Sequence, residues 1–333
     1  MKIYSSEVSG SLKVRGDIFA ENYIVKSTVT TITQSFSSGS TIFGDSNDDT
    51  HRFTGSLSIS GSIGIKSDSR NNLFIGQNAG TGSGIGQSNT AIGIDALTSP
   101  RGAESIVAIG RNAGKNITKS AQSGVYSVLI GNSANYNNTG GSNNIAIGYN
   151  AAGHSTNSMT NTLVLGNFAA QSGPGPTNST VIGIHAFGNV SGNHPQYVTA
   201  LGGYALYGSA STTTGINGAV AIGHKSLYSI TSGAGNTAVG YEAGYALTSG
   251  NSNTIIGYDA GKTLTTGADN VIIGRDAGND TNGSKAVIIG GYAADDNSPT
   301  NAVVIGYAAG RVINGENTTA VGYNALKVAT EPD

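Results

Sequence analysis

The feature that most constrains this chain is a short motif that it repeats fifteen times. The stretch "NTIIGYDAG", Asn253–Gly261, has close relatives seventeen residues before and after it, "NTAVGYEAG" and "NVIIGRDAG". Successive copies begin 16 to 21 residues apart. The shared glycine, taken here as position 0, recurs at Gly76, Gly93, Gly110, Gly131, Gly148, Gly166, Gly183, Gly202, Gly223, Gly240, Gly257, Gly274, Gly290, Gly306 and Gly322.

Each copy obeys the same residue rules. Position −1, Ile256 in the quoted copy, is always Ile, Leu or Val, and position −2, here Ile255, is always apolar but varies in size. Position +3, here Ala260, is alanine in fourteen copies and serine in the other. A short β-branched run that ends at glycine, between turn residues, is typical of a strand.

A period near seventeen is too short for a helix–turn–helix repeat or a propeller blade, and it suits one coil of a parallel β-solenoid. Coils stacked at the strand spacing of about 4.8 Å would form a section about 70 Å long. Within each coil, Gly257 is expected to form a corner and Ala260 to occupy a tight position. Asparagine before the strand is expected to stack on the asparagine of the next coil.

The two adjacent apolar positions lead to a prediction about assembly. Neighbouring strand residues point to opposite faces, so we expect Ile256 to face the interior of its own coil and Ile255 to face outward. A strand that is apolar on both faces is covered on both faces. We therefore predict an all-β, homotrimeric fibre of about fifteen coils, in which the three copies cover one another.

The sequence divides into three parts. Residues 1–68 alternate in short pieces and predict a β-rich stem or attachment region, 69–326 form the repeat solenoid, and 327–333 are a C-terminal tail. A short helix over Ile24–Phe36 is an alternative, which the many Thr and β-branched residues there disfavour.

Composition excludes several classes of function. Only 11% of the residues are charged and the net charge is −2, so a basic surface for nucleic acid is not expected. The chain has no cysteine, which excludes disulfides and thiolate metal sites. Residues 1–20 contain no apolar run of the length that a secretory signal needs, and no run long enough for a transmembrane helix is present.

Catalytic patterns are missing, so we predict no enzyme activity and no cofactor. No histidine lies in a recognisable catalytic motif, and His185 and His224 occupy repeat positions where we expect solvent exposure. The repeat unit occurs once per coil with uneven spacing, which disfavours a left-handed β-helix acyltransferase, kept as a minor alternative. The five histidines are His51, His154, His185, His194 and His224.

Three features are candidate binding sites. Oxygen-rich "GDSNDDTH" (residues 44–51) is a weak candidate for a cation, with Asp45, Asp48 and Asp49 as ligands. The two longest repeats must form loops, and these are candidate surface decorations, Lys115–Gly124 and Tyr207–Gly218. Tyrosine at position +1 predicts an exposed aromatic ladder that either docks sugar rings or stacks only on itself. Its members in consecutive copies are Tyr241, Tyr258, Tyr307 and Tyr323.

The strings "NTAIGIDAL", "SVLIGNSA" and "NNIAIGYNAAG" resemble the head repeats of trimeric autotransporter adhesins and repeats in phage tail fibres. The resemblance covers residues 71–326 and implies a trimeric, left-handed parallel β-roll. The segment "GSTIFGDSNDDTHRFTGSLSISGS" is similar to stems of phage structural proteins. The chain differs from the autotransporters in lacking a recognisable signal peptide and membrane anchor, and in its longer, less even period.

These observations predict a structural and adhesive fibre protein of a phage tail or a phage-like contractile injection particle. The expected location is a virion tail or extracellular particle appendage. Expected partners are two further copies, a baseplate or fibre protein at the N-terminal end, a tip protein at the C-terminal end, and a host receptor, for which glycan is one candidate. The alternative is a cell-surface trimeric adhesin exported by a non-Sec route.

Overall fold

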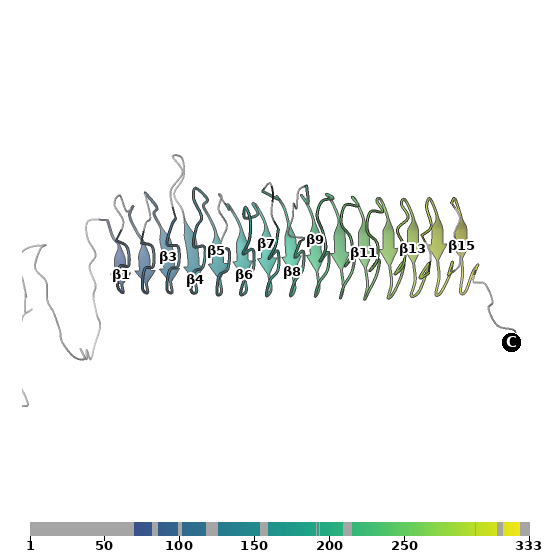
Figure 1. Cartoon of the computed structure of the whole chain (residues 1–333), viewed down its shortest axis with the longest axis horizontal. Helices are drawn as coiled ribbons and strands as arrows, with labels where there is room; N and C mark the ends of the chain where they lie inside the picture. The colour runs from purple at the N-terminus through teal and green to yellow at the C-terminus, as the bar shows by residue number, and fades with distance from the viewer. Residues whose placement is uncertain are drawn as a thin grey trace, which may run out of the picture. The chain divides into compact units, whose positions relative to one another are not determined.

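The computed structural model shows a parallel β-solenoid. It describes residues 70–326 apart from 82–85, 99–101, 118–125, 154–158, 191, 193, 209–214, 297 and 312–315. One strand from each repeat joins a single fifteen-stranded sheet, and the coils follow one another in chain order (Figure 1). The strands are β1 (Leu73–Ile75), β2 (Thr90–Ile92), β3 (Ile106–Ile109), β4 (Ser127–Ile130), β5 (Ile145–Ile147), β6 (Leu163–Leu165), β7 (Thr180–Ile182), β8 (Thr199–Leu201), β9 (Val220–Ile222), β10 (Thr237–Val239), β11 (Thr254–Ile256), β12 (Val271–Ile273), β13 (Val287–Ile289), β14 (Val303–Ile305) and β15 (Thr319–Val321).

Every neighbouring pair of strands is parallel and in the register of the repeat. Ile255 of β11 pairs with Ala238 of β10 and Ile272 of β12, each of which also stands at position −2. Because the register follows the repeat, each position forms a column along the solenoid. The predicted all-β parallel solenoid is confirmed, and the described residues contain no helix.

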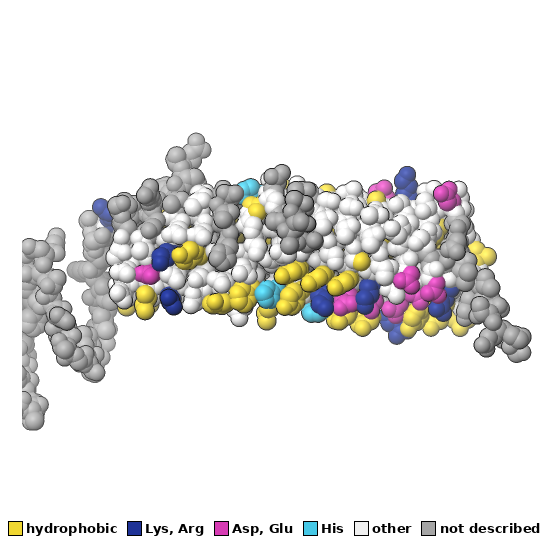
Figure 2. Space-filling model, viewed as in Figure 1, with side chains coloured by type: hydrophobic (Ala, Val, Ile, Leu, Met, Phe, Trp, Pro, Cys, Tyr) yellow, Lys and Arg dark blue, Asp and Glu magenta, His cyan; other side chains and the backbone are white. Residues whose placement is uncertain are grey.

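Charge is distributed unevenly along the columns. No Asp, Glu, Lys or Arg occurs between Lys119 and Lys225, so the middle coils carry no formal charge. Figure 2 shows hydrophobic and histidine side chains along one edge of these coils, with charged side chains among them toward the β15 end. The solenoid thus has a neutral middle section and a charged section that follows it.

The corner glycine is required by both conformation and space. Gly257 has a φ of +142°, where side chains are strained. A Cβ on Gly257 would lie 2.4 Å from the carbonyl oxygen of Gly274 in the next coil. The glycine column therefore permits backbone-to-backbone packing between coils, as the sequence predicted.

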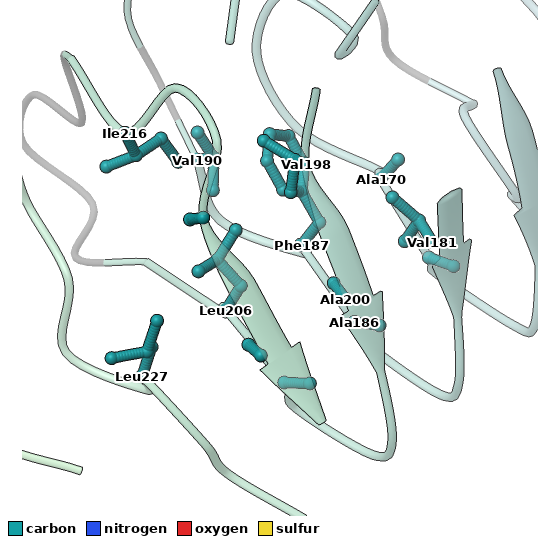
Figure 3. Close-up of a cluster of buried hydrophobic side chains, with 14 of the residues drawn as sticks. Ala170, Val181, Ala186, Phe187, Val190, Val198, Ala200, Leu206, Ile216 and Leu227 are labelled. Carbon is teal, nitrogen blue, oxygen red and sulfur yellow. The ribbon is translucent and has the colours of Figure 1, made fainter. Parts of the chain in front are cut away.

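The coil interior is filled by positions −2 and +4, where a large residue at one position is matched by a small residue at the other or by large residues of the neighbouring coils. Ile255 is paired with Gly261, whereas Ala221 is paired with Leu227, and all four are buried. A Cβ on Gly261 would lie 3.4 Å from Cγ2 of Ile255, which shows that the two positions share one space. Figure 3 shows side chains of successive coils, Phe187 among them, pointing into this interior. Close packing of this kind explains why position −2 varies in size.

The predicted assignment of the two strand faces is wrong by one residue. Ile255 is fully buried in the coil interior, whereas the side chain of Ile256 is 37% exposed. The prediction that neighbouring strand residues point to opposite faces is confirmed. The choice of the inward-facing residue was wrong because it assumed that the constant position, −1, is the buried one. In the structure the constant column faces outward, and the variable column faces inward, where position +4 and the neighbouring coils accommodate its size. Ala260 is buried, as predicted.

Buried asparagines connect successive coils, which confirms the predicted stacking. Nδ2 of Asn253 donates to Oδ1 of Asn236 at 3.0 Å, and Nδ2 of Asn270 donates to Oδ1 of Asn253 at the same distance. The backbone N–H of Asn253 also donates to Oδ1 of Asn236, at 2.9 Å. These bonds satisfy polar groups that the narrow interior would otherwise leave unpaired.

By its internal contacts the chain separates into Met1–Ile63 and Gly64–Asp333, and the described residues belong to the second unit. The predicted stem (1–68) and the C-terminal tail (327–333) lie outside the described residues. The helix considered for Ile24–Phe36 lies outside them as well.

Candidate functional site

The outer face of the sheet is formed by positions −3 and −1 of the fifteen strands and is called the outer face below. Position −1 is Ile, Leu or Val throughout, and position −3 is aliphatic or threonine, so the outer face carries no charge. At the strand spacing of about 4.8 Å, it is about 67 Å long. Its most exposed aliphatic side chains are Ile75, Ile145, Ile147, Leu201, Ile256, Val303, Ile305 and Val321.

A continuous apolar strip of this length is unusual for a chain that stays alone in water. Monomeric proteins rarely expose contiguous apolar patches of more than a few hundred Å². The argument that one strand face lacks a cover therefore holds, but the exposed residue is Ile256 and not Ile255. Ile255 and Ala260 are buried within the coil, and Gly257 packs at its corner against the backbone of the next coil.

A second surface follows the strand, at positions +1, +2 and +5, and is called the corner edge. Over the middle coils its side chains form an aromatic ladder with ring centroids about 5 to 6 Å apart. A shorter column at position +5 runs beside it, with centroid distances of 5.2 and 5.1 Å. The ladder comprises Tyr149, Phe168, His185, Tyr204, His224, Tyr241 and Tyr258, and the shorter column Tyr207, Tyr228 and Tyr245.

The predicted tyrosine pairs are confirmed as stacks. The Tyr241 and Tyr258 rings lie 5.1 Å apart at an interplanar angle of 10°, and those of Tyr307 and Tyr323 lie 5.7 Å apart at 9°. Each ring therefore covers one face of its neighbour. Because stacking on a sugar needs a free ring face, no sugar ring fits between the members of a pair. The outward edges, the hydroxyls and the far faces of Tyr258 and Tyr323 are what the pairs offer to a ligand.

Charged side chains lie beside the last three rings of the aromatic ladder, in the same coils. Nζ of Lys262 lies 2.7 Å from Oε2 of Glu242 and 3.1 Å from Oδ2 of Asp259, and Nζ of Lys225 lies 3.7 Å from Oε1 of Glu242. Burial alone would raise the pKa of Glu242. The hydrogen bond and positive charge of Lys262 outweigh burial and hold that pKa below its ordinary value. The carboxylates in turn raise the pKa of Lys262.

At the end of the solenoid, a hollow of about 360 Å³ is lined by Tyr292, Tyr307, Arg311 and Tyr323. The guanidinium of Arg311 is already paired, because its Nη2 lies 3.5 Å from Oδ2 of Asp295 and 3.3 Å from Oδ2 of Asp296. Burial, with the neighbouring Asp296 carboxylate, raises the pKa of Asp295. An anionic ligand would therefore compete with two carboxylates for this arginine.

Two of the histidines within the described residues contact aromatic rings, and a third lies beside a backbone carbonyl. His185 is half-buried and stacks between Phe168 and Tyr204, so it is less exposed than predicted, whereas His224 is exposed beside Tyr241. Nδ1 of His194 lies 3.3 Å from the carbonyl oxygen of Gly175. His51 and His154 lie outside the described residues.

Metal ligation finds no support in the part of the chain that the structure describes, where no three His, Asp or Glu side chains gather around a common point. The weak candidates Asp45, Asp48 and Asp49 lie outside it. Most of the predicted loop Lys115–Gly124 and half of Tyr207–Gly218 also lie outside it, so both remain predictions. Within the same described residues, no helix is long and apolar enough to span a bilayer.

Sequence reasoning found position +1 and missed positions +2 and +5. Phe168, His185 and Tyr204 stand at +2, one residue after the tyrosine column, and the structure places both positions in one ladder. A tabulation of aromatic residues at every repeat position would have shown this shift.

Comparison with known proteins does not assign the fold to a family. No family model, curated protein or solved structure matches the chain.

Proposed function

We propose that this chain is a structural and adhesive fibre protein of a phage tail or phage-like injection particle, assembled as a parallel homotrimer. The observation that supports the proposal best is the outer face, uncharged on all fifteen strands and exposed in a single chain. A partner that covers it must match fifteen rungs at the strand spacing. A second copy of this chain has that periodicity.

Three copies account for the shape of the outer face better than two. Each strand is three or four residues long, so the face is narrow and long. Three such faces can surround a common axis and each contact both others, as in a closed cyclic assembly. The trimer buries aliphatic side chains along the whole solenoid and stiffens it.

The role of such an assembly is mechanical and adhesive. The rod acts as a spacer that projects a contact surface toward a host, with the N-terminal part attached to the particle. The repeat strings that resemble tail-fibre and adhesin-head repeats support this role. The corner edge, with its aromatic and charged sections, is the part of each coil that varies and is available for contacts.

The test is the mass and shape of the purified chain. Light scattering after size-exclusion chromatography should give three times the chain mass of 33.4 kDa, and negative-stain microscopy should show rods. Fluorescently labelled rods should then adhere to host cells and compete with particle adsorption. A globular monomer would overturn the trimer, and rods that fail to compete would overturn the adhesive role.

A further inference from the structure

A groove lies beside the shorter tyrosine column, on the chain that follows the corner rather than on the strand. It has a volume of about 330 Å³ and is lined by Asn189, Tyr207, Tyr228, Ser229, Thr231 and Thr248. These residues come from four consecutive coils, those of β7 to β10. The groove therefore runs along the solenoid for about 14 Å, three intervals of the strand spacing. Its volume is within the range of ligand sites.

The lining is polar and carries no charge. The side chains of Asn189, Tyr207, Tyr228 and Ser229 make no hydrogen bond with any other described residue. They leave amide and hydroxyl groups free to donate and accept. Burial raises the pKa of Tyr228, which keeps this phenol a neutral donor.

Two threonines of the lining supply further acceptors. Oγ1 of Thr231 donates to the carbonyl oxygen of Thr248 at 2.9 Å, and Oγ1 of Thr248 donates to that of Thr265 at the same distance. Each hydroxyl proton is therefore committed, and each oxygen still accepts. A ligand with closely spaced hydroxyls can bond to the free amide and hydroxyl groups and to these acceptors together.

The tyrosines present their edges to the groove. Tyr207 and Tyr228 lie 5.2 Å apart at an interplanar angle of 10°, so their facing sides are covered. The other side of Tyr207 packs on Gly188, where a Cβ would lie 2.9 Å from the ring. A ligand therefore cannot stack flat on the Tyr207 ring. Hydrogen bonds to the phenol hydroxyls are the contacts that the tyrosines can still make with it.

We propose that this groove binds a short segment of a linear, neutral polysaccharide that runs along the solenoid axis. The proposal deepens the function proposed above, on which its biological setting rests, because it names the class of receptor. A chain of sugar units offers hydroxyls at regular intervals along its length, as the groove offers partners from successive coils.

Other ligand classes fit less well. An anionic polymer needs free cations, and Lys225, whose Nζ lies 6.0 Å from the centroid of the Tyr228 ring, is also 3.7 Å from the carboxylate of Glu242. An apolar ligand would leave the amide and hydroxyl groups of the groove without partners, which is costly. Since no ring face is used, each groove binds weakly, and simultaneous binding by three copies supplies the avidity that attachment needs.

The test is saturation-transfer NMR on the full chain with tetrasaccharide probes. Cellotetraose, maltotetraose, mannotetraose and chitotetraose represent neutral chains, and tetragalacturonic acid represents acidic ones. We expect transfer to at least one neutral probe and none to the acidic probe. The Y207F/Y228F variant keeps the stack but loses two hydroxyls, and should bind about tenfold more weakly. The matched control Y126F/Y197F loses two exposed hydroxyls outside the groove, and should bind like the wild type.

Each remaining outcome decides one proposal. Transfer to no neutral probe, equal transfer to the acidic probe, or equal losses in the two variants would overturn the groove. The mass of the same sample keeps the two proposals apart. Trimeric rods without sugar binding would overturn the groove and leave the fibre, whereas a monomer that binds sugar would overturn the fibre and leave the groove.

Discussion

Positions −2 and −1 are adjacent, equally aliphatic columns, and their surroundings differ completely. Ile255 is enclosed by its own coil and the next ones, whereas Ile256 is exposed on the outer face. The inner column is explained within one chain, because its size variation is accommodated by position +4 and by the neighbouring coils. The outer column varies only among Ile, Leu and Val, and within the described residues Ile256 is paired with the same position of the adjacent strands.

The difference shows that constancy and burial are separate signals. An inner residue can exchange volume with a partner inside the coil, so its identity varies. A residue in contact with an identical surface has no such freedom, so a narrow set of shapes is expected there. In this chain the constant column is the one that points away from its own core.

The largest contrast is expected between two aspartate substitutions in the same strand. Ile255→Asp places a charge in a fully buried interior and should destabilise the coil by more than about 4 kcal/mol. Ile256→Asp should leave the coil folded and weaken the trimer. Circular dichroism with light scattering separates the two effects. Ile256→Asp that still has the mass of three chains would contradict the assigned interface.

A smaller contrast is expected between two glycines. Gly257→Ala introduces a Cβ 2.4 Å from a carbonyl oxygen and strains a φ of +142°, and should cost about 3 kcal/mol in the free energy of unfolding. A Cβ on Gly203 would find no atom closer than 3.5 Å, so Gly203→Ala should lie within about 0.5 kcal/mol of the wild type. Denaturant unfolding measures both. Equal effects would show that the corner tolerates a side chain.

The smallest effect is expected on the corner edge. Glu242→Gln removes the charge that pairs with Lys262 and should cost about 2 kcal/mol at neutral pH. The pKa of Glu242 is lowered in the folded state, so its contribution is present above the ordinary value of 4.5 and is lost as the pH falls through the lower value. The difference in melting temperature from the wild type should shrink over that range. The exposed Glu316→Gln is the control, and a pH-independent difference for Glu242→Gln would contradict the ion pair.

Much of the fold was predictable because the repeat rules act locally. Glycine at the corner, alanine at +3 and asparagine before the strand each follow from the conformation or space of one coil. The phase of the strand was not predictable from constancy alone, since Ile255 and Ile256 are equally hydrophobic. The signal that favours the observed phase is a large residue at −2 with a small one at +4, as in Ile255 and Gly261.

The candidate site was predictable in part. Tyr241 and Tyr258 follow from the repeat, but the groove joins residues of four coils whose repeats differ in length, so its lining depends on the three-dimensional register. Tyr207 and Thr248 occupy different repeat positions, five and eight residues after their glycines. Nothing in either position alone marks a common surface.

The in-register stacking has a consequence for length. Each repeat adds the same axial step of about 4.8 Å whether it contains 16 or 21 residues, because the extra residues leave the strand ladder unchanged. Insertion or loss of a whole repeat would therefore change the reach of the protein by one step and keep every other strand in register. The number of repeats therefore sets the length of the solenoid in steps of one strand spacing. Selection can change this length without changing the surface of the other coils.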